Sequence, residues 1–419
     1  MAKKRIGFIG TRFAGTDGVS LETFKWAKVL RDEGHECYYM AGELETPASR
    51  SLLVPECHFR NEQIWSIHEA CFGHTTRSRD ISLLTEECKR GIKEHIYEYV
   101  EKFKIDVLVP ENAITIPFNI PLGLAISEFM MESKIKMIAH HHDFYWERAR
   151  FLQNACWDYL ATGFPPNLFM AQHAVLNSSQ HHQLSLRRGL SAVIVPNVMD
   201  FNHEPSPADE YSEDIREQLG IAPDEVFVLQ PTRIVKRKGI EHAIELVHRL
   251  GRPAKLVISH AAGDEGEEYY SRVLQYAELL KVDLVLCADN VSETRGILPD
   301  GRKIYTLADM YQRCDIVTYP SYIEGFGNAF LEALYYRRPI VVNDYSIYKY
   351  DIKPKGFRSI EMDGYVSAQT IRDTCEILDN PARAAEIADH NYKLAERYFS
   401  FEILRTQLNA MLMECFGAQ

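Results

Sequence analysis

A chain of 419 residues is too long for one ordinary hydrophobic core and is expected to form two domains. Hydrophobic residues make up 46% of it and charged residues 25%, which is typical of a soluble globular protein. The formal net charge of −12 argues against a nucleic-acid partner and, less strongly, against docking on anionic membranes, because both select basic surfaces.

The cysteines and the N-terminus indicate a cytoplasmic protein. The nine cysteines are scattered and never spaced as C-x-x-C, which predicts reduced, mostly packed thiols. The first apolar run is short and ends at Gly10, so it predicts a strand rather than a signal peptide. No stretch reaches the roughly 18 apolar residues that a membrane helix needs, and no integral membrane segment is expected.

In the first half of the chain, short apolar runs alternate with helical patterns. A helix over 20–36, ending near Gly34, separates strands predicted over 5–10 and 37–42. Further strands are predicted over 106–112, 136–143, 174–179 and 192–197. This spacing predicts a parallel, doubly wound sheet, in which ligands collect at the carboxyl ends of the strands.

The segment 195–214 is rich in Pro, Asp, Glu and Ser and is interpreted as a linker. After it the pattern restarts, with a helix over 239–250 and strands over 226–233, 254–260, 283–288, 315–320 and 339–344. We therefore predict Rossmann-like domains over 1–200 and 201–385, followed by C-terminal helices over 386–419.

The stretch PSYIEGFGNAFLEALYYRRPIVV (320–342) carries two acids around a Gly-x-Gly turn. Glu324 precedes the turn, and Glu332 lies on the helix that begins at Asn328. The glycines let backbone N–H groups approach a ligand, and the helix start offers an anion site. Carboxylates suit sugar hydroxyls, which donate hydrogen bonds to them. The alternative is that Glu324 caps the helix and Glu332 is solvated.

A basic cluster follows the first strand of the second half. PTRIVKRKG (231–239) places Arg233, Lys236, Arg237 and Lys238 beside a glycine and a helix start. Two of these cations could converge on a diphosphate; the alternative is an exposed basic loop. A cationic loop and a double-acid glycine turn in one α/β domain are together an improbable coincidence.

TRIVKRKGIEHAIE and EGFGNAFLEALYYRRPIVV resemble the paired signatures of retaining GT-B glycosyltransferases of family 4 (glycosyl transferases group 1). The order of parts matches over essentially the whole chain, including a PN-x-x-D linker entry at Pro196, Asn197 and Asp200. Two departures are Thr232 in place of the usual glycine and a first loop that keeps only Gly18. The resemblance implies an α/β fold with two doubly wound domains facing across a cleft and C-terminal helices crossing back to the first domain.

The resemblance also implies the donor site. Arg233 and Lys238 would neutralise the diphosphate of the donor. Glu332 would bind the ribose, and Glu324 would contact the hexose. Further donor contacts would come from Gly18, Gly325, Phe326, Gly327, Asn328 and Ala329. Such enzymes retain the anomeric configuration without a protein nucleophile or a metal, so no cofactor is expected beside the substrate, GDP-mannose or UDP-glucose.

The stretch HHHDFYWERARF (140–151) suggests zinc at first sight. Adjacent strand residues point to opposite faces, so His140, His141 and His142 cannot all bind one ion without distortion, and no metal site is predicted. In the resemblance, a histidine at this strand end contacts the donor sugar and the acceptor. His142 is preferred as a catalytic residue, together with Arg233, Lys238 and Glu324, and His141 is placed close behind it.

Arg148 and Arg150, with Trp146 nearby, could line an acceptor pocket for a carboxylate or phosphate. The alternative is that both arginines pair with acids on the surface. No basic amphipathic N-terminal helix marks a lipid acceptor. The remaining acceptor candidates are His141, Asp143 and Asn112, with Arg77 and Arg79 as weaker ones.

The sequence thus predicts a metal-independent, retaining hexosyltransferase. It would move mannose or glucose from a nucleoside-diphosphate sugar to a small soluble, anionic acceptor such as a glycerate or sugar derivative. Two alternatives stay open: a GT-B phosphorylase or sugar-nucleotide epimerase, and a non-catalytic nucleotide-sugar binder. A homo-oligomer is also left open.

Overall fold

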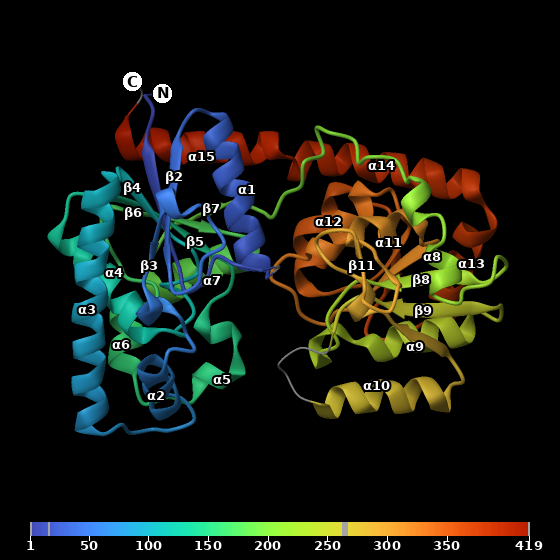
Figure 1. Cartoon of the computed structure of the whole chain (residues 1–419), viewed down its shortest axis with the longest axis horizontal. Helices are drawn as coiled ribbons and strands as arrows, with labels where there is room; N and C mark the ends of the chain where they lie inside the picture. Colours follow the sequence, from blue (N-terminus) through green and yellow to red (C-terminus); the bar gives the residue numbers. More distant parts are fainter. Residues whose placement is uncertain (1, 16, 262–266, 418–419) are drawn as a thin grey trace. The chain divides into compact units, whose positions relative to one another are not determined.

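The computed structural model describes residues 2–15, 17–261 and 267–417. The chain forms two compact units, each built around its own parallel sheet (Figure 1). Unit 1 runs to Val198 and includes the segment from Phe401 on, and unit 2 is Met199–Ser400. None of the described helices combines the length and hydropathy that crossing a membrane requires.

Unit 1 holds a seven-stranded sheet in the order β3-β2-β1-β4-β5-β6-β7, and every pair in it is parallel. Its strands are β1 Arg5–Ile9, β2 Glu36–Ala41, β3 Ser51–Leu53, β4 Val107–Pro110, β5 Lys136–His141, β6 Ala171–Val175 and β7 Val193–Ile194. Its helices are α1 Gly18–Asp32, α2 Glu62–Cys71, α3 Arg79–Phe103, α4 Ile120–Glu132, α5 Ala149–Leu152, α6 Trp157–Gly163, α7 Ser178–Arg188 and α15 Phe401–Phe416.

Helices cover both faces of this sheet and form two apolar cores. One core joins α2, α3, α4 and α6 to the sheet. On the other face, α1 and α15 lie side by side although they come from opposite ends of the sequence (Figure 1). Because each helix has one apolar face, burying it against the sheet removes that face from water.

Unit 2 holds a six-stranded sheet in the order β10-β9-β8-β13-β14-β15, again with every pair parallel. Its strands are β8 Val226–Gln230, β9 Ala254–Ile258, β10 Asp283–Leu286, β13 Ile316–Tyr319, β14 Ile340–Asn343 and β15 Ile360–Met362, and a hairpin pairs β11 Gly296–Ile297 with β12 Lys303–Ile304. Its helices are α8 Ile215–Gln218, α9 Ile240–Arg249, α10 Glu267–Leu279, α11 Leu307–Arg313, α12 Asn328–Tyr335, α13 Ala368–Asp379 and α14 Pro381–Phe399.

Both sheets reverse their strand order at one place. In unit 1 the reversal lies between β1 and β4, and in unit 2 between β8 and β13. At such a switch point the flanking loops leave in opposite directions and open a crevice at the carboxyl ends of the strands. The loops after β1, β4, β8 and β13 therefore carry the residues that a ligand would meet.

The structure confirms the predicted α/β class and the doubly wound parallel sheets. The strand expected over 174–179 is shorter and ends at Val175, because Asn177 caps α7 by accepting from the backbone N–H of Gln180. Strands β3 and β15 were missed, since three residues are too few for a period-two pattern.

The C-terminal segment 386–419 is divided between the units. Helix α14 belongs to unit 2, and only α15 packs on unit 1. The predicted linker 195–214 is extended at its start and buries Val195, Val198 and Phe201. All nine cysteines are free thiols and seven are buried, so packing rather than cross-linking is what they contribute.

Candidate functional site

The loops after β8 and β13 in unit 2 contact each other at the switch point. Gly239 has a φ of +59°, and a Cβ there would lie 2.5 Å from the carbonyl oxygen of Pro320. The backbone N–H of Tyr322 donates to the carbonyl of Arg237 at 2.8 Å. Glycine is therefore required at 239 for two reasons, the left-handed backbone and the close approach of the other loop.

This approach brings a cationic and an acidic side chain together. Lys238 Nζ donates to Glu324 Oε1, and Arg237 Nη1 lies 3.2 Å from Glu324 Oε2. The Lys238 and Glu324 side chains are 10% and 8% exposed. The two partners are 86 residues apart in sequence, so only the fold joins them.

Burial alone would raise the pKa of Glu324, but attraction to Lys238 and Arg237 holds it below its ordinary value. The carboxylate is therefore ionised at neutral pH. Burial lowers the pKa of Lys238, and the attraction of Glu324 opposes this only in part. The ammonium is poorly hydrated, so an anionic ligand would interact with it more strongly than with a surface lysine.

The start of helix α12 completes this edge of the sheet. Gly327 has a φ of +125°, and a Cβ there would lie 2.5 Å from Tyr345 Oη. Tyr345 Oη donates to the carbonyl of Phe326 at 2.9 Å. On the helix itself, Tyr311 Oη donates to Glu332 Oε2 at 2.8 Å. The predicted donor residues 325–329 and Glu332 thus follow β13 directly, on the same edge as Lys238 and Glu324.

Arg233 and His260 lie near the same edge. Arg233 is exposed on the loop after β8. His260 follows β9, and burial together with the charges of Lys238 and Arg233 lowers its pKa to about 4. Sequence reasoning missed His260 and did not choose Arg237 among the cations. The position of each at a strand end or beside the signature glycine was the available signal.

In unit 1, Gly18 is the first residue of α1, and Asp17 caps that helix by accepting from the N–H groups of Val19 and Ser20. Gly18 is exposed, and a Cβ there would meet no atom of the described residues within 4 Å. The backbone by itself therefore does not require glycine at this position.

The three histidines at the end of β5 divide between two environments. His141 is fully buried and hydrogen-bonds Thr115 through Nδ1 at 2.7 Å and His173 through Nε2 at 2.8 Å. Both of its nitrogens are engaged, so His141 does not fit the predicted acceptor role. His142 is the least buried of the three, at 8% exposure.

His140 and His142 lie on the same side of β5 and converge on Glu111, the residue after β4. Glu111 Oε2 is 2.8 Å from His140 Nδ1 and 3.1 Å from His142 Nε2. Ligand atoms of the three groups lie within 4.8 Å of one another, so they could hold a metal ion. Three successive histidines do not converge, as expected, but two of them and a carboxylate do. Sequence reasoning missed Glu111, although it follows a buried strand.

Burial dominates the electrostatics of this cluster. It lowers the pKa of His140 to about 3 and lowers the pKa of His142, and it raises the pKa of Glu111. The imidazoles are therefore neutral at physiological pH.

Asn112, Asp143 and Arg148 form a polar network beside this cluster. Asn112 has a φ of +56°, and its Nδ2 donates to Asp143 Oδ1 at 2.9 Å. Arg148 Nε donates to Asp143 Oδ2 at 2.7 Å. The structure thus brings three predicted acceptor residues together, with the Arg148 side chain 39% exposed.

The other predicted acceptor residues lie in aromatic surroundings. The Arg150 guanidinium is 4.5 Å from the ring centroid of Phe118. Trp146 stacks on Phe144 at 4.4 Å. Arg77 forms an ion pair with Asp158, which gives it a structural role, whereas Arg79 is exposed at the start of α3.

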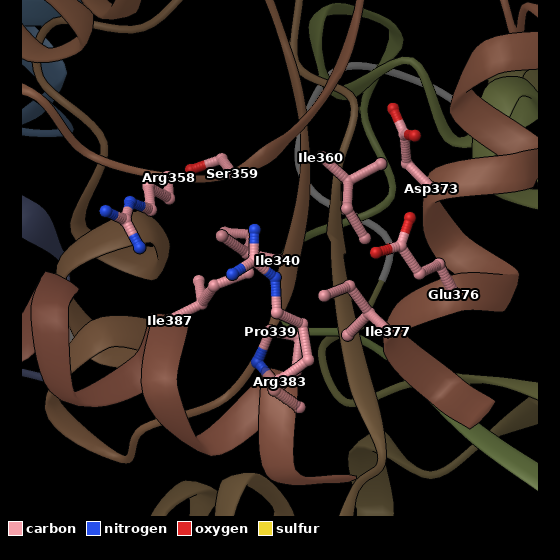
Figure 2. A pocket seen from close by; sticks show the side chains of 11 residues that line it. Pro339, Ile340, Arg358, Ser359, Ile360, Asp373, Glu376, Ile377, Arg383 and Ile387 are labelled. Carbon is pink, nitrogen blue, oxygen red and sulfur yellow. The ribbon is translucent and has the colours of Figure 1, made fainter. Parts of the chain in front are cut away.

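Figure 2 shows a pocket elsewhere in unit 2. Asp373 and Glu376 of α13 lie on one side of it, and Arg383 of α14 and Arg358 lie on the other. Ile340 and Ile360, the first residues of β14 and β15, also line it, so the pocket is at the amino ends of these strands. None of the predicted site residues lines this pocket.

The chain is similar to known proteins in sequence and in fold. Residues 301–385 match the sequence model of the family glycosyl transferases group 1. The chain is 32% identical over 379 residues to the mannosylglucosylglycerate synthase of Petrotoga mobilis, covering 85% of this chain and 86% of the relative. It is 30% identical over 437 residues to the mannosylglucosylglycerate synthase of Thermotoga maritima, covering 97% and 99%.

A similar solved structure is a glycosyltransferase from Rickettsia africae ESF-5, with a TM-score of 0.68, 13% sequence identity and coverage of 100% of both chains. At this identity the likeness concerns the fold alone. The identity and coverage of the two synthases establish the relationship, and the strand order of the two sheets agrees with it. The chain therefore belongs to the GT-B glycosyltransferases of family 4, the glycosyl transferases group 1.

Proposed function

We propose that this chain transfers a hexosyl group, mannose or glucose, from a nucleoside-diphosphate sugar to a glycerate-derived acceptor. The observation that carries the proposal is the Lys238–Glu324 pair at the switch point of unit 2, next to the start of α12. Both relatives that match at least 85% of the chain are named mannosylglucosylglycerate synthases, and a glycerate carries a carboxylate.

In this proposal the residues of unit 2 bind the donor. Lys238 and Arg233 neutralise the diphosphate and stabilise it as it leaves, which is the work that a metal ion performs elsewhere. The N–H groups at the start of α12 bind a phosphate oxygen. Glu332 accepts hydrogen bonds from ribose hydroxyls, and Glu324 from the hexose.

The residues of unit 1 contact the sugar and the acceptor. His142 binds the donor hexose and the acceptor hydroxyl. Arg148 and Arg150 attract the acceptor carboxylate, since a guanidinium offers two parallel donors to it. We further propose retention of the anomeric configuration, without a protein nucleophile and without a required metal.

The first experiment incubates the protein with GDP-mannose or UDP-glucose and with glucosylglycerate or glycerate. We expect a new glycoside with one donor, and the anomeric proton in its NMR spectrum should show the configuration of the donor. Activity should survive treatment with EDTA. Release of free nucleotide without any glycoside would contradict transfer.

The variants Arg148→Ala and Arg150→Ala test the proposed binding of an anionic acceptor. Each removes a charged hydrogen-bond donor worth about 1.5–3 kcal/mol, so the KM for the acceptor should rise about 10- to 100-fold while the donor KM stays constant. Lys102→Ala, an exposed cation of α3, is the matched control. Unchanged acceptor KM in both arginine variants, with a neutral acceptor as the substrate, would refute an anionic acceptor.

A further inference from the structure

The carboxylate of Glu111 is almost completely enclosed and contacts two histidines through one oxygen. Its residue exposure is 2%, and Oε2 is 2.8 Å from His140 Nδ1 and 3.1 Å from His142 Nε2. An ionised carboxylate only accepts hydrogen bonds. If Glu111 is ionised, both imidazole nitrogens that face it must therefore carry protons.

Each neutral imidazole carries one proton, so this contact fixes the tautomer of both rings. His140 is then protonated on Nδ1, and its Nε2, which is buried and has no hydrogen-bond partner among the described residues, holds only a lone pair. His142 is protonated on Nε2, which leaves its Nδ1 as a hydrogen-bond acceptor. An acceptor nitrogen suits a substrate hydroxyl, which donates.

The backbone of His142 is held in place as firmly as its ring. Its N–H donates to Asn112 Oδ1 at 3.1 Å, and its carbonyl accepts from Gln180 Nε2 at 2.9 Å. On the other side of the cluster, the Trp26 ring stacks on His140 at 4.0 Å. The ring of His142 can therefore turn only by breaking its contact with Glu111.

We propose that Glu111 is a positioning residue, which fixes His142 in the Nε2–H tautomer so that Nδ1 accepts a hydrogen bond from a substrate hydroxyl. The proposal rests on the function proposed above only for the identity of that hydroxyl. The tautomer itself is a property of the protein without substrate.

The test measures histidine tautomers by long-range ¹H–¹⁵N correlation in ¹⁵N-labelled full-length protein without ligand, at pH 7. We expect the His142 ring to be protonated on Nε2 and the His140 ring on Nδ1. Protonation of His142 on Nδ1 would overturn the proposal, because Glu111 would then be the donor. This measurement does not depend on activity, so it distinguishes failure here from failure of the proposed function.

Glu111→Gln provides the second measurement. The amide is neutral, and its NH2 group donates hydrogen bonds, so it no longer requires both facing imidazole nitrogens to carry protons. We expect His142 to lose its single tautomer and kcat to fall about 10- to 100-fold, the size of one hydrogen bond to a charged group, with both KM values nearly constant. Asp309→Asn is the matched control. Asp309 is equally buried but lies in unit 2, where it accepts from the Thr306 N–H at 2.8 Å and from Arg295 Nε at 3.1 Å, so its substitution should leave the His142 tautomer unchanged.

A metal ion bound by the same three groups is the competing interpretation. Titration with Co²⁺ should leave the visible spectrum of the wild-type protein unchanged. A tetrahedral cobalt absorption that disappears in Glu111→Gln would replace the positioning role with a metal site.

Discussion

The two units share one strand order but differ in the groups that they present at their switch points. Unit 2 presents cations, a paired carboxylate and a helix start, all on two loops. Unit 1 presents neutral histidines around a buried carboxylate, next to Asn112, Asp143 and Arg148. Charged groups are concentrated at the switch point of unit 2, whereas neutral imidazoles surround the buried carboxylate in unit 1. Under the proposed function, the charges of unit 2 would meet the diphosphate and the groups of unit 1 would meet hydroxyls and a carboxylate, because the loops differ while the sheets share their strand order.

The largest expected effect tests the charge in unit 2. Lys238→Met should lower kcat/KM about 10²- to 10³-fold, the cost of removing one preorganised electrostatic group. Lys236→Ala, an exposed lysine of the same loop, is the control and should stay within about threefold of wild type, as surface changes away from such groups usually do. Steady-state kinetics measure both.

Loss of Lys238 also removes part of the charge that compensates the buried Glu324 carboxylate, while Arg237 Nη1 stays 3.2 Å from Oε2. Removing one partner of a buried ion pair destabilises by up to about 3–5 kcal/mol. The double variant Lys238→Met, Glu324→Gln should recover stability in a denaturant melt but not activity. Recovery of activity in the double variant would mean that the pair is structural.

The next effect concerns how much stability each unit loses in acid. Burial lowers the pKa of His140 to about 3 and of His173 to about 4, and holds that of His141 well below its ordinary value, all in unit 1. Among the described histidines of unit 2, a comparable lowering, to about 4, occurs at His260.

These imidazoles stay neutral in the folded protein but bind protons in the unfolded chain. Each of them therefore lowers the free energy of unfolding by up to about 1.4 kcal/mol per pH unit below pH 6.5. Burial raises the pKa of Glu111, and it raises the pKa of Glu147 to about 7. Both shifts act in the opposite direction in unit 1 but involve fewer groups. Between pH 7 and 5, unit 1 should therefore lose more stability than unit 2.

Hydrogen exchange at the two pH values, corrected for intrinsic rates, measures each unit separately. Strands β4, β5 and β6 should lose more protection than β8 and β13. His173→Gln removes one of the groups and should reduce the difference. Equal loss in both units would show that the buried histidines do not determine acid stability.

A smaller effect compares two glycines. Gly327→Ala forces an alanine to a φ of +125° and drives its Cβ toward Tyr345 Oη, so the free energy of unfolding should fall by about 1–3 kcal/mol. Chemical denaturation measures this. A stable variant with normal donor binding would mean that the loop before α12 adjusts freely.

The smallest effect is expected at Gly18 of unit 1. Among the residues that the structure describes, none would lie within 4 Å of a Cβ at position 18, so Gly18→Ala should change the free energy of unfolding by no more than about 0.5 kcal/mol. A rise in donor KM in this stable variant would show that glycine is kept at 18 for the ligand rather than for the backbone. A large loss of stability would contradict the open surroundings of this position.

The sequence selected the residues that meet in unit 2 more completely than those that meet in unit 1. In unit 2 the candidate residues lie in two contiguous motifs, so spacing and a family resemblance select them together. In unit 1 the residues that meet come from separate segments without a shared motif. Arg148 and Asp143 were chosen from one stretch, but Glu111 was passed over and His141 was given a role that its burial does not fit.

By itself the sequence determined the parallel α/β architecture and the chemistry of the cationic and acidic loops, because apolar periodicity, glycine positions and charge are local properties. Only the tertiary structure decided that Lys238 pairs with Glu324, and that Glu111 contacts His140 and His142 while His141 faces Thr115. The physical reason is that hydrogen bonds between residues 26 to 86 positions apart depend on sheet order and strand register, which bring together positions that no local pattern relates.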